Sequence, residues 1–252
     1  MKILCLHGAY GSAKAFRTQL DPFVAKLEKV GKVEFKFVDG QFPVKPPDGF
    51  EDYFGPAPWY RNIEFDGIDG LAKMVDKLRT HTDGESYEDT LRSLLGSGDM
   101  PFELGTLQRT MDRIKQYLDE DPEIEGILGY SEGATTAASY ILHEAEQEQE
   151  NGQQRRIKFA IFFAGWPPGR FQDGVMKAVL ADESDLMIDL PTCHIVGSTD
   201  PYLYGAMSLY SVCDEDRATL FDHGKGHTVP RDATTIQELA AAIKKTMSEA
   251  GL

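Results

Sequence analysis

The sequence predicts an α/β fold in which helices cover both faces of a mostly parallel central sheet. Two observations favour it. Short apolar runs alternate with longer segments of helical periodicity, and several of the runs contain no polar residue. A strand that is apolar throughout is buried on both faces, as parallel strands between helical layers are. The 252 residues are enough for one large domain or two small ones, and we expect a single domain over 1–252.

The first elements are a strand, a helix and a second strand. Residues 3–6 form an apolar run that leads into a glycine-containing loop at 7–11. Residues 16–30 carry apolar side chains at helical spacing, but Pro22 has to lie near the start of this helix or break it. Residues 33–38 alternate apolar and charged side chains, which predicts a strand.

Residues 40–105 interrupt this alternation. The stretches 42–47 and 54–60 are rich in proline and aromatic residues, and a residue that precedes proline favours extended backbone over helix. The region has too few apolar residues for a core of its own. Because long connections are more often lids or binding loops than filler, we expect a lid-like insertion at about 40–105.

The second half returns to the alternation. We expect a helix over 106–119, a strand that ends in Ile127 and Leu128, and a helix that follows Ser131. Apolar strands are predicted at 159–163, 192–196 and 219–221, and a last helix at 234–247. The one dense acidic run, 144–150, is expected to be an exposed helix end that leads into a loop.

The charge disfavours two classes of partner. The formal net charge is −15 and the pI is near 4.8, so no basic patch can neutralise the phosphates of nucleic acid or of an anionic membrane. No apolar stretch approaches the length of a membrane span, and the first apolar run is too short for a secretory signal. We therefore expect no nucleic-acid partner and no membrane.

The three cysteines predict buried, reduced thiols rather than disulfides. Cys5 and Cys193 lie in apolar runs, and Cys213 has no cysteine close to it in sequence. Reduced thiols fit a reducing compartment, so we expect a cytoplasmic protein. We expect neither a cofactor nor a metal ion.

Residues 129–133 fit the nucleophile-elbow pattern G-x-S-x-G around Ser131. A serine on a sharp strand-to-helix turn needs strained backbone and small neighbours, which Gly129 and Gly133 supply. The pentapeptide alone is weak evidence. Its context strengthens it, because an apolar run precedes Ser131 and the small residues of 134–138 follow it.

A serine hydroxyl needs a base to remove its proton and a third group to orient that base. In elbow folds the order along the chain is serine, acid, histidine. Asp200 follows one predicted strand and His227 lies in a glycine-flanked loop after the next. Catalytic groups of parallel sheets gather at the carboxyl ends of strands, so we predict Ser131, Asp200 and His227 as the catalytic residues.

Other residues compete for these roles. His223 lies closer to its strand, but the glycines beside His227 give that residue the freer loop. Three further acids lie in a charged connection or at a strand edge and fit the surface better: Asp214, Asp216 and Asp222. His194, inside an apolar strand, is predicted to be a buried structural histidine. For His7 a structural hydrogen bond is a better expectation than catalysis.

Backbone amides near Ser131 are predicted to bind the negative oxygen of a tetrahedral intermediate. One donor would be the amide of Glu132, the residue after the serine, at the positive end of the following helix. The other would come from the loop at 8–11, with Ala9 favoured and Tyr10 next.

The chain resembles the family-serine-hydrolase group of the α/β hydrolases, which contains small fungal esterases, a human ovarian-tumour-associated hydrolase and fungal thioesterases that release polyketides. The matching motifs span most of the chain: 7–8, 129–134, 164–168, 197–201 and 226–230. The resemblance implies the α/β-hydrolase fold, with Ser131 as nucleophile, Asp200 as orienting acid and His227 as base. Glu132 departs from it, because many members have glutamine at this position.

Aromatic residues in loops expected around Ser131 suggest an apolar acyl site: Phe54, Trp59, Tyr60, Trp166, Tyr202 and Tyr204. The leading expectation is a hydrolase of acyl thioesters or carboxyl esters. The resemblance favours release of a polyketide or similar acyl chain from an acyl-carrier protein in fungal secondary metabolism, although an acidic surface gives an acidic carrier no electrostatic help. The alternatives are a general short- or medium-chain carboxylesterase and, third, a non-catalytic ligand-binding protein.

Overall fold

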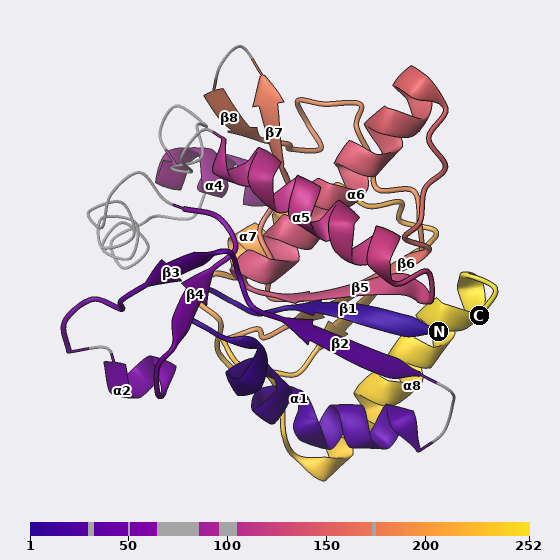
Figure 1. The fold of residues 1–252 in the computed structure, drawn as a ribbon. Coiled ribbons are helices and arrows are strands. Elements are labelled where there is room, and N and C mark those ends of the chain that lie inside the picture. Colours follow the sequence, from indigo (N-terminus) through magenta and orange to yellow (C-terminus); the bar gives the residue numbers. More distant parts are fainter. Residues whose placement is uncertain (30–32, 50, 65–85, 96–104, 173–174) are drawn as a thin grey trace.

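The structure is a computed structural model that describes residues 1–252 except 30–32, 50, 65–85, 96–104 and 173–174. At its centre, six strands of the described chain form a parallel sheet in the order β10-β9-β6-β5-β1-β2. Figure 1 labels β6, β5, β1 and β2 of this sheet. The six strands are β1 (Lys2–Leu6), β2 (Glu34–Val38), β5 (Ile124–Tyr130), β6 (Phe159–Phe163), β9 (Thr192–Val196) and β10 (Ala218–Asp222). Each was predicted from the sequence within two or three residues, apart from the start of β5, for which no boundary was predicted.

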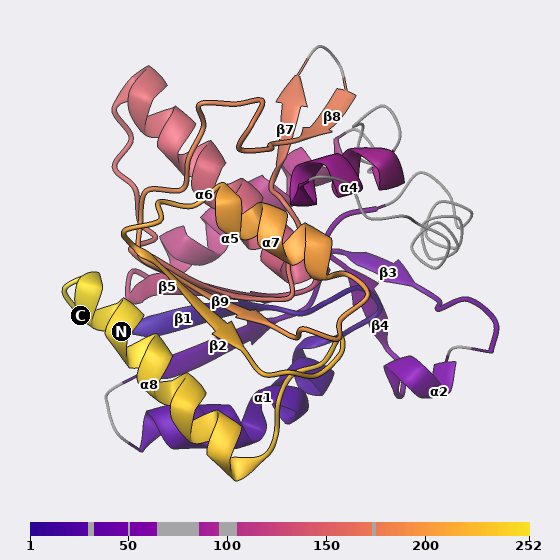
Figure 2. The ribbon, with the colours of Figure 1, turned by 180° about the vertical axis from the view of Figure 1, so that it is seen from behind.

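Helices cover both faces of the sheet (Figures 1 and 2). On one side lie α1 (Ala13–Glu28) and α8 (Ala233–Glu249), and on the other α5 (Thr106–Glu120), α6 (Glu132–Asn151) and α7 (Leu203–Ser211). Side chains of β1 alternate between the two layers: Ile3 and Cys5 belong to the buried cluster with α1 and α8, and Leu4 and Leu6 to the cluster with α5 and α6. The predicted α/β architecture is confirmed.

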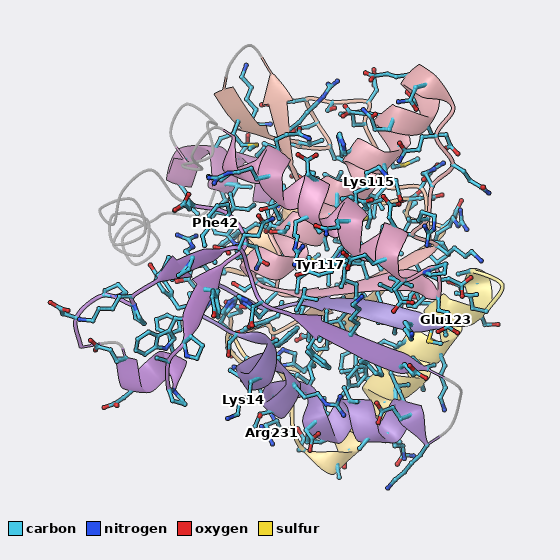
Figure 3. The ribbon with its side chains drawn as sticks, in the orientation of Figure 1. Lys14, Phe42, Lys115, Tyr117, Glu123 and Arg231 are labelled. Carbon is cyan, nitrogen blue, oxygen red and sulfur yellow. The ribbon has the colours of Figure 1, made fainter. Side chains whose placement is uncertain are left out.

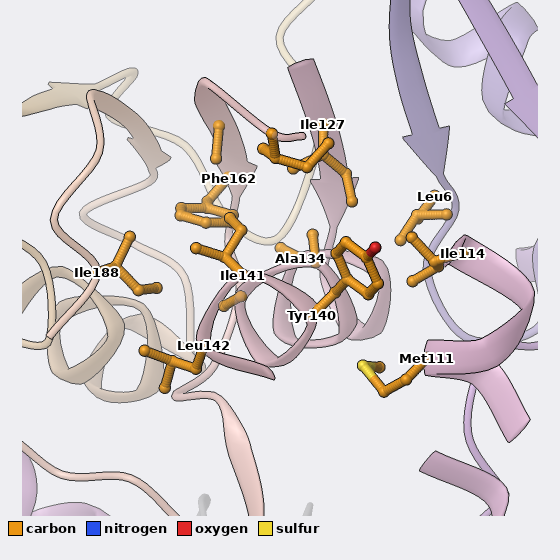
Figure 4. Close-up of a cluster of buried hydrophobic side chains, with 14 of the residues drawn as sticks. Leu6, Met111, Ile114, Ile127, Ala134, Tyr140, Ile141, Leu142, Phe162 and Ile188 are labelled. Atoms are coloured by element: carbon orange, nitrogen blue, oxygen red, sulfur yellow. The ribbon is translucent and has the colours of Figure 1, made fainter. Parts of the chain in front are cut away.

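The buried cluster around α6 fixes that helix against the sheet (Figure 4). Ala134 and Ile141 of α6 pack with Ile127 of β5 and Phe162 of β6, and all four side chains are at most 1% exposed. Small residues at the start of α6 allow the helix to approach the strands closely. This packing holds the turn between β5 and α6 in place.

Polar contacts fasten the outer elements to the sheet. At the amino end of the sheet, Lys2 lies 2.8 Å from Glu123, just before β5. On α5, the ring of Tyr117 lies 5.5 Å from the ammonium of Lys36 in β2 (Figure 3 labels Tyr117 and Glu123). These contacts bring α5 and the start of β5 against the strands that precede them in sequence.

Pro22 lies inside α1, although it was expected to lie near the start of the helix or to break it. Proline has no N–H, so the carbonyl of Thr18, one turn earlier, loses its helical donor. Arg231, labelled in Figure 3, supplies a replacement: its Nη1 donates to Thr18 O at 3.1 Å. The expectation was wrong because this donor comes from a residue more than 200 positions away.

Several elements were not predicted. Within 40–105 the structure contains β3 (Phe42–Val44), α2 (Glu51–Phe54), β4 (Trp59–Arg61) and α4 (Tyr87–Leu95), with β3 and β4 antiparallel. Elsewhere, α7 and the antiparallel pair β7 (Gly169–Gln172) and β8 (Val175–Ala178) were also missed. Residues 65–85 and 96–104 of the expected lid lie outside the described residues, and the lid stays a prediction.

The acidic run at 144–150 is only partly an exposed helix end. The helix ends at Asn151, close to where it was expected to end, but Glu144 is 2% exposed. Its carboxylate accepts the backbone N–H groups of Arg156 at 2.9 Å and Ile157 at 3.2 Å. Burial raises the pKa of Glu144. This acid is therefore structural and holds the chain that enters β6.

The buried histidine of β9 predicts how stability depends on pH. His194 packs against the rings of Phe162 and Tyr210, as a structural histidine, and burial lowers its pKa to about 3. Above about pH 6.5 the unfolded chain is also neutral at this residue, so its contribution to stability is complete. Below about pH 6.5 the unfolded chain binds a proton that the folded chain does not, and the free energy of unfolding falls, by about 2 kcal/mol at pH 5.

Urea unfolding at pH 7.5 and pH 5, for the wild type and for His194→Gln, measures this contribution. The wild type is expected to lose about 2 kcal/mol more than the variant between the two pH values. Both proteins contain His7 and Glu144, so the difference between their losses cancels the contributions of these two residues. Burial also lowers the pKa of His7, whereas the raised pKa of Glu144 acts in the opposite direction. An equal loss in both proteins would contradict the prediction.

Candidate active site

Ser131 occupies the sharp turn between β5 and α6. Its φ of 53° and ψ of −119° are strained for a residue with a side chain. Glycine is required on either side: a Cβ on Gly129 would lie 2.3 Å from the carbonyl oxygen of Gly133, and a Cβ on Gly133 would lie 2.2 Å from that of Leu6. The turn is held by the N–H of Ser131, which donates to Phe163 O of β6 at 2.8 Å. The sequence pattern therefore has the strained geometry expected of it.

The three residues predicted as catalytic lie in one hydrogen-bonded row. His227 Nε2 lies 3.0 Å from Ser131 Oγ, and His227 Nδ1 lies 2.8 Å from Asp200 Oδ2. The Asp200 side chain is 2% exposed and that of His227 17%. With a proton on Nδ1, His227 donates to the carboxylate and leaves Nε2 to accept the serine proton.

Parallel strands bring these residues to one edge of the sheet. Ser131 follows β5, Asp200 follows β9, and His227 follows β10, so all three lie beyond carboxyl ends. The other oxygen of Asp200 accepts the N–H of Tyr202 at 2.8 Å. Both carboxylate oxygens are thus engaged, and the acid is held in one orientation.

The rival residues have other partners. His223 Nδ1 accepts the N–H of Lys225 at 3.3 Å, and burial lowers the pKa of His223. Asp222 Oδ1 accepts the N–H groups of Gly224 at 2.7 Å and Ser198 at 2.9 Å, and these bonds hold its pKa below the ordinary value. Both residues fix the backbone of the loops that carry Asp200 and His227.

Two tyrosines flank the imidazole. The ring of Tyr202 lies edge-on at 4.8 Å from the ring of His227, and the ring of Tyr130 lies at 5.3 Å. The Tyr130 hydroxyl also donates to the carbonyl oxygen of His227 at 3.2 Å. Aromatic and hydrogen-bonding contacts thus restrict the position of the histidine.

The loop that follows β1 runs beside the serine. A Cβ on Gly8 would lie 3.3 Å from Ser131 Cβ, and Tyr10 has a φ of 58°. His7 is structural, as expected: burial lowers its pKa, Nε2 accepts the N–H of Gly40 at 2.8 Å, and Nδ1 therefore donates to Gly8 O at 2.7 Å. The amides of Ala9, Tyr10 and Glu132 stay the predicted donors to a substrate oxygen.

The carboxylate of Glu132 is buried and paired. Arg61 Nε donates to Glu132 Oε2 at 2.7 Å, and Arg61 Nη2 reaches the same oxygen. The N–H of Asn62 donates to Oε1 at 2.6 Å. Neither partner was predicted from the sequence, because nothing in the pattern distinguishes Arg61 among the 26 lysines and arginines.

The six predicted substrate-contacting aromatic residues are all half-buried, and four of them fall into two groups. Trp166 packs against Tyr202 with a ring distance of 6.2 Å, next to His227. Phe54 lies 4.8 Å from the ring of Tyr10, and Tyr60 pairs with Gly11 through backbone.

The remaining two of these aromatic residues contact other parts of the chain. Trp59 Nε1 donates to Gly55 O at 2.9 Å, and the ring of Tyr204 lies 6.2 Å from that of Tyr87 in α4. Phe54 and Tyr60 therefore lie on the side of the loop at 8–11, and Trp166 and Tyr202 on the side of His227.

Among the described residues, no three His, Cys, Asp or Glu side chains come together as a metal site would need. None of the helices described is long and apolar enough to cross a membrane.

Comparisons with known proteins give a matching family profile, fungal relatives and a similar solved structure. A family profile described as "Serine hydrolase (FSH1)" matches residues 1–239. The esterase FPY3 of Fusarium mangiferae is 26% identical over 99% of this chain and 98% of its own length. The hydrolase phiM of a fungal species is 24% identical, over 97% and 94%. The structure of a Bacillus cereus carboxylesterase matches with a TM-score of 0.53 at 15% identity, covering 97% of this chain and 87% of that one, and confirms the fold.

Proposed function

This chain belongs to the serine hydrolase (FSH1) family, and we propose that Ser131 is its nucleophile, His227 its general base and Asp200 the acid that orients the base. The observation that carries this proposal is the row of hydrogen bonds from Asp200 through His227 to Ser131, which begins at a buried carboxylate and ends at a serine on a strained turn. A base oriented in this way activates a hydroxyl for attack.

In the proposed reaction, Ser131 Oγ attacks the carbonyl carbon of an ester or thioester while His227 Nε2 takes the hydroxyl proton. The amides of Glu132 and of Ala9 or Tyr10 stabilise the resulting oxyanion. The bond to the leaving alcohol or thiol breaks as His227 returns the proton to it, which leaves an acyl group on Ser131. Water then attacks the acyl-enzyme with His227 again as base, and the carboxylic acid is released.

The substrate that we propose is an acyl thioester or carboxyl ester, in particular a polyketide or similar acyl chain released from a carrier protein. The esterase and hydrolase names of the fungal relatives support ester chemistry. The half-buried Trp166 and Tyr202 beside His227 support an apolar acyl group. The pairing of Glu132 with Arg61 supports a neutral acyl group, because it neutralises the acid that follows the nucleophile in sequence.

A general short- or medium-chain carboxylesterase is the second candidate. The net charge of −15 favours it, because an acidic surface does not attract an acidic carrier protein. We also propose a cytoplasmic location, supported by the three buried, free thiols of Cys5, Cys193 and Cys213.

One experiment with two readouts tests the proposal. A fluorophosphonate probe is expected to add covalently to the wild type at Ser131 and to leave Ser131→Ala unmodified, as measured by intact-protein mass spectrometry. Matched acyl N-acetylcysteamine thioesters and oxygen esters are then compared by kcat/KM. An unmodified wild type would rule out both enzyme candidates and leave the ligand-binding alternative. Turnover of oxygen esters equal to or above that of thioesters would favour the carboxylesterase.

A further inference from the structure

The carboxylate next to the nucleophile has an unusually complete set of partners. Both Glu132 and Arg61 are buried, with side chains 5% and 6% exposed. Three donors converge on the carboxylate: Nε and Nη2 of Arg61, and the N–H of Asn62. Charge-assisted bonds of this kind are short and directional, so the start of α6 is fixed relative to β4.

The loop after β1 lies between the same two elements. On one side, Gly133 of α6 approaches the carbonyl oxygens of Leu6 and His7 so closely that a Cβ there would lie 2.2 and 2.6 Å from them. On the other side, Asn62 Nδ2 donates to His7 O at 2.7 Å and the N–H of Tyr60 donates to Gly11 O at 2.8 Å.

Contacts at the far end of this loop complete the connection. The guanidinium of Arg61 lies 5.7 Å from the ring centre of Tyr10, the residue at positive φ. Behind Arg61, a Cβ on Gly40 would lie 2.3 Å from Arg61 O, and the N–H of Gly40 donates to His7 Nε2. The hydroxyl of Thr110 donates to Asn62 O at 2.5 Å, which also fastens this segment to α5.

A contribution to stability does not explain such a pair well. The free energy needed to take two charges out of water is about as large as the free energy gained from their attraction. Apolar residues can therefore often replace a buried ion pair without loss of stability. The position of the pair suggests another role. It joins the element that contains the amide of Glu132 to the segment that supports the amides of Ala9 and Tyr10.

We propose that Arg61 and Glu132 are a positioning pair, which sets the distance between the two halves of the oxyanion site on either side of Ser131. The proposal rests on the function proposed above. Donors of an oxyanion site act mainly in the transition state, because they are aimed at charge that develops there. Misplacing them should therefore lower kcat and leave KM nearly unchanged.

The principal test is the double variant Arg61→Met/Glu132→Gln. It removes both charges together, so no lone charge is buried, and it keeps an oxygen that can accept from Asn62. The matched control is Arg155→Met/Asp189→Asn, which removes a bidentate pair that links the segment after α6 to the one before β9, with contacts of 2.5 and 3.1 Å. Arg61→Lys is a second variant, which keeps the charge but loses the planar fork.

Steady-state hydrolysis of p-nitrophenyl butyrate and binding of two inhibitors provide the readouts. We expect kcat of the double variant to fall about 10- to 100-fold, as displacements on the order of 1 Å cause, with KM changed less than about threefold. A trifluoromethyl ketone, which forms a tetrahedral adduct with serine, should lose affinity in parallel with kcat. Butyrate, which resembles only the ground-state product, should bind as before. Arg61→Lys should show a smaller loss of the same kind.

The outcomes separate this proposal from the one it rests on. If the wild type hydrolyses no ester and resists the fluorophosphonate probe, the proposed function fails. If the wild type is active and the double variant keeps kcat within about twofold, or the control pair loses as much, the positioning role alone is overturned. If the double variant does not fold, Arg61→Lys decides in the same way: an unchanged kcat and ketone affinity overturn the proposal.

Discussion

Replacing His227 by glutamine is expected to lower kcat about 10⁴- to 10⁶-fold, as removal of the base does in hydrolases of this kind. Glutamine can occupy the place of the imidazole but cannot take the proton of Ser131 or return it to the leaving group. The hydrogen bonds of 3.0 and 2.8 Å that His227 forms with Ser131 and Asp200 are the physical basis of the prediction. Ester hydrolysis under saturating substrate measures it.

His223→Gln is the matched control for this variant. It makes the same change four residues earlier in the same loop, at a ring whose Nδ1 accepts the N–H of Lys225. We expect kcat to stay within about threefold of the wild type, because a bond of this strength is worth about 1 kcal/mol or less to the fold. A larger loss in His223→Gln than in His227→Gln would transfer the role of base to His223.

Gly133→Ala is expected to cause a large loss of stability for the addition of a single methyl group. The new Cβ would lie 2.2 Å from Leu6 O and 2.6 Å from His7 O. Both are backbone atoms of a buried segment, so neither can turn aside as a flexible side chain would. Relief requires α6 to move away from β1, and we expect the free energy of unfolding to fall by about 3 kcal/mol or more.

Urea unfolding followed by circular dichroism measures this loss, with Gly226→Ala as the control. Among the described residues, a Cβ on Gly226 would meet only Thr199 O, at 3.8 Å. This change is therefore expected to alter the free energy of unfolding by less than about 1 kcal/mol. If the two alanine variants were equally stable, the close approach of α6 to β1 would be wrong.

The parts of the fold that the sequence predicted are those whose causes lie close together in the chain. The turn at Ser131 depends on Gly129 and Gly133, which are two residues away, and β6 is apolar throughout. The row of Ser131, Asp200 and His227 could be expected because the carboxyl ends of parallel strands lie at one edge of the sheet. Residues in the loops that follow different strands therefore come close together.

The parts that could not be predicted depend on distant residues. Pro22 is tolerated in α1 because Arg231 satisfies the carbonyl of Thr18. Glu132 is neutralised by Arg61, from a proline- and aromatic-rich region whose periodicity is weak. The helix α4 was missed although Leu91 and Leu94 are buried. Its nine residues are too few to show helical periodicity clearly.

The pairing of Arg61 with Glu132 also limits how this protein can evolve. The two positions are 71 residues apart, yet a mutation at either one alone leaves a buried charge without its partner, which typically costs 3–5 kcal/mol. A lineage that exchanges Glu132 for glutamine must therefore lose the cation at position 61 at nearly the same time. Among descendants of this protein, Arg61 and Glu132 should therefore be kept together or replaced together.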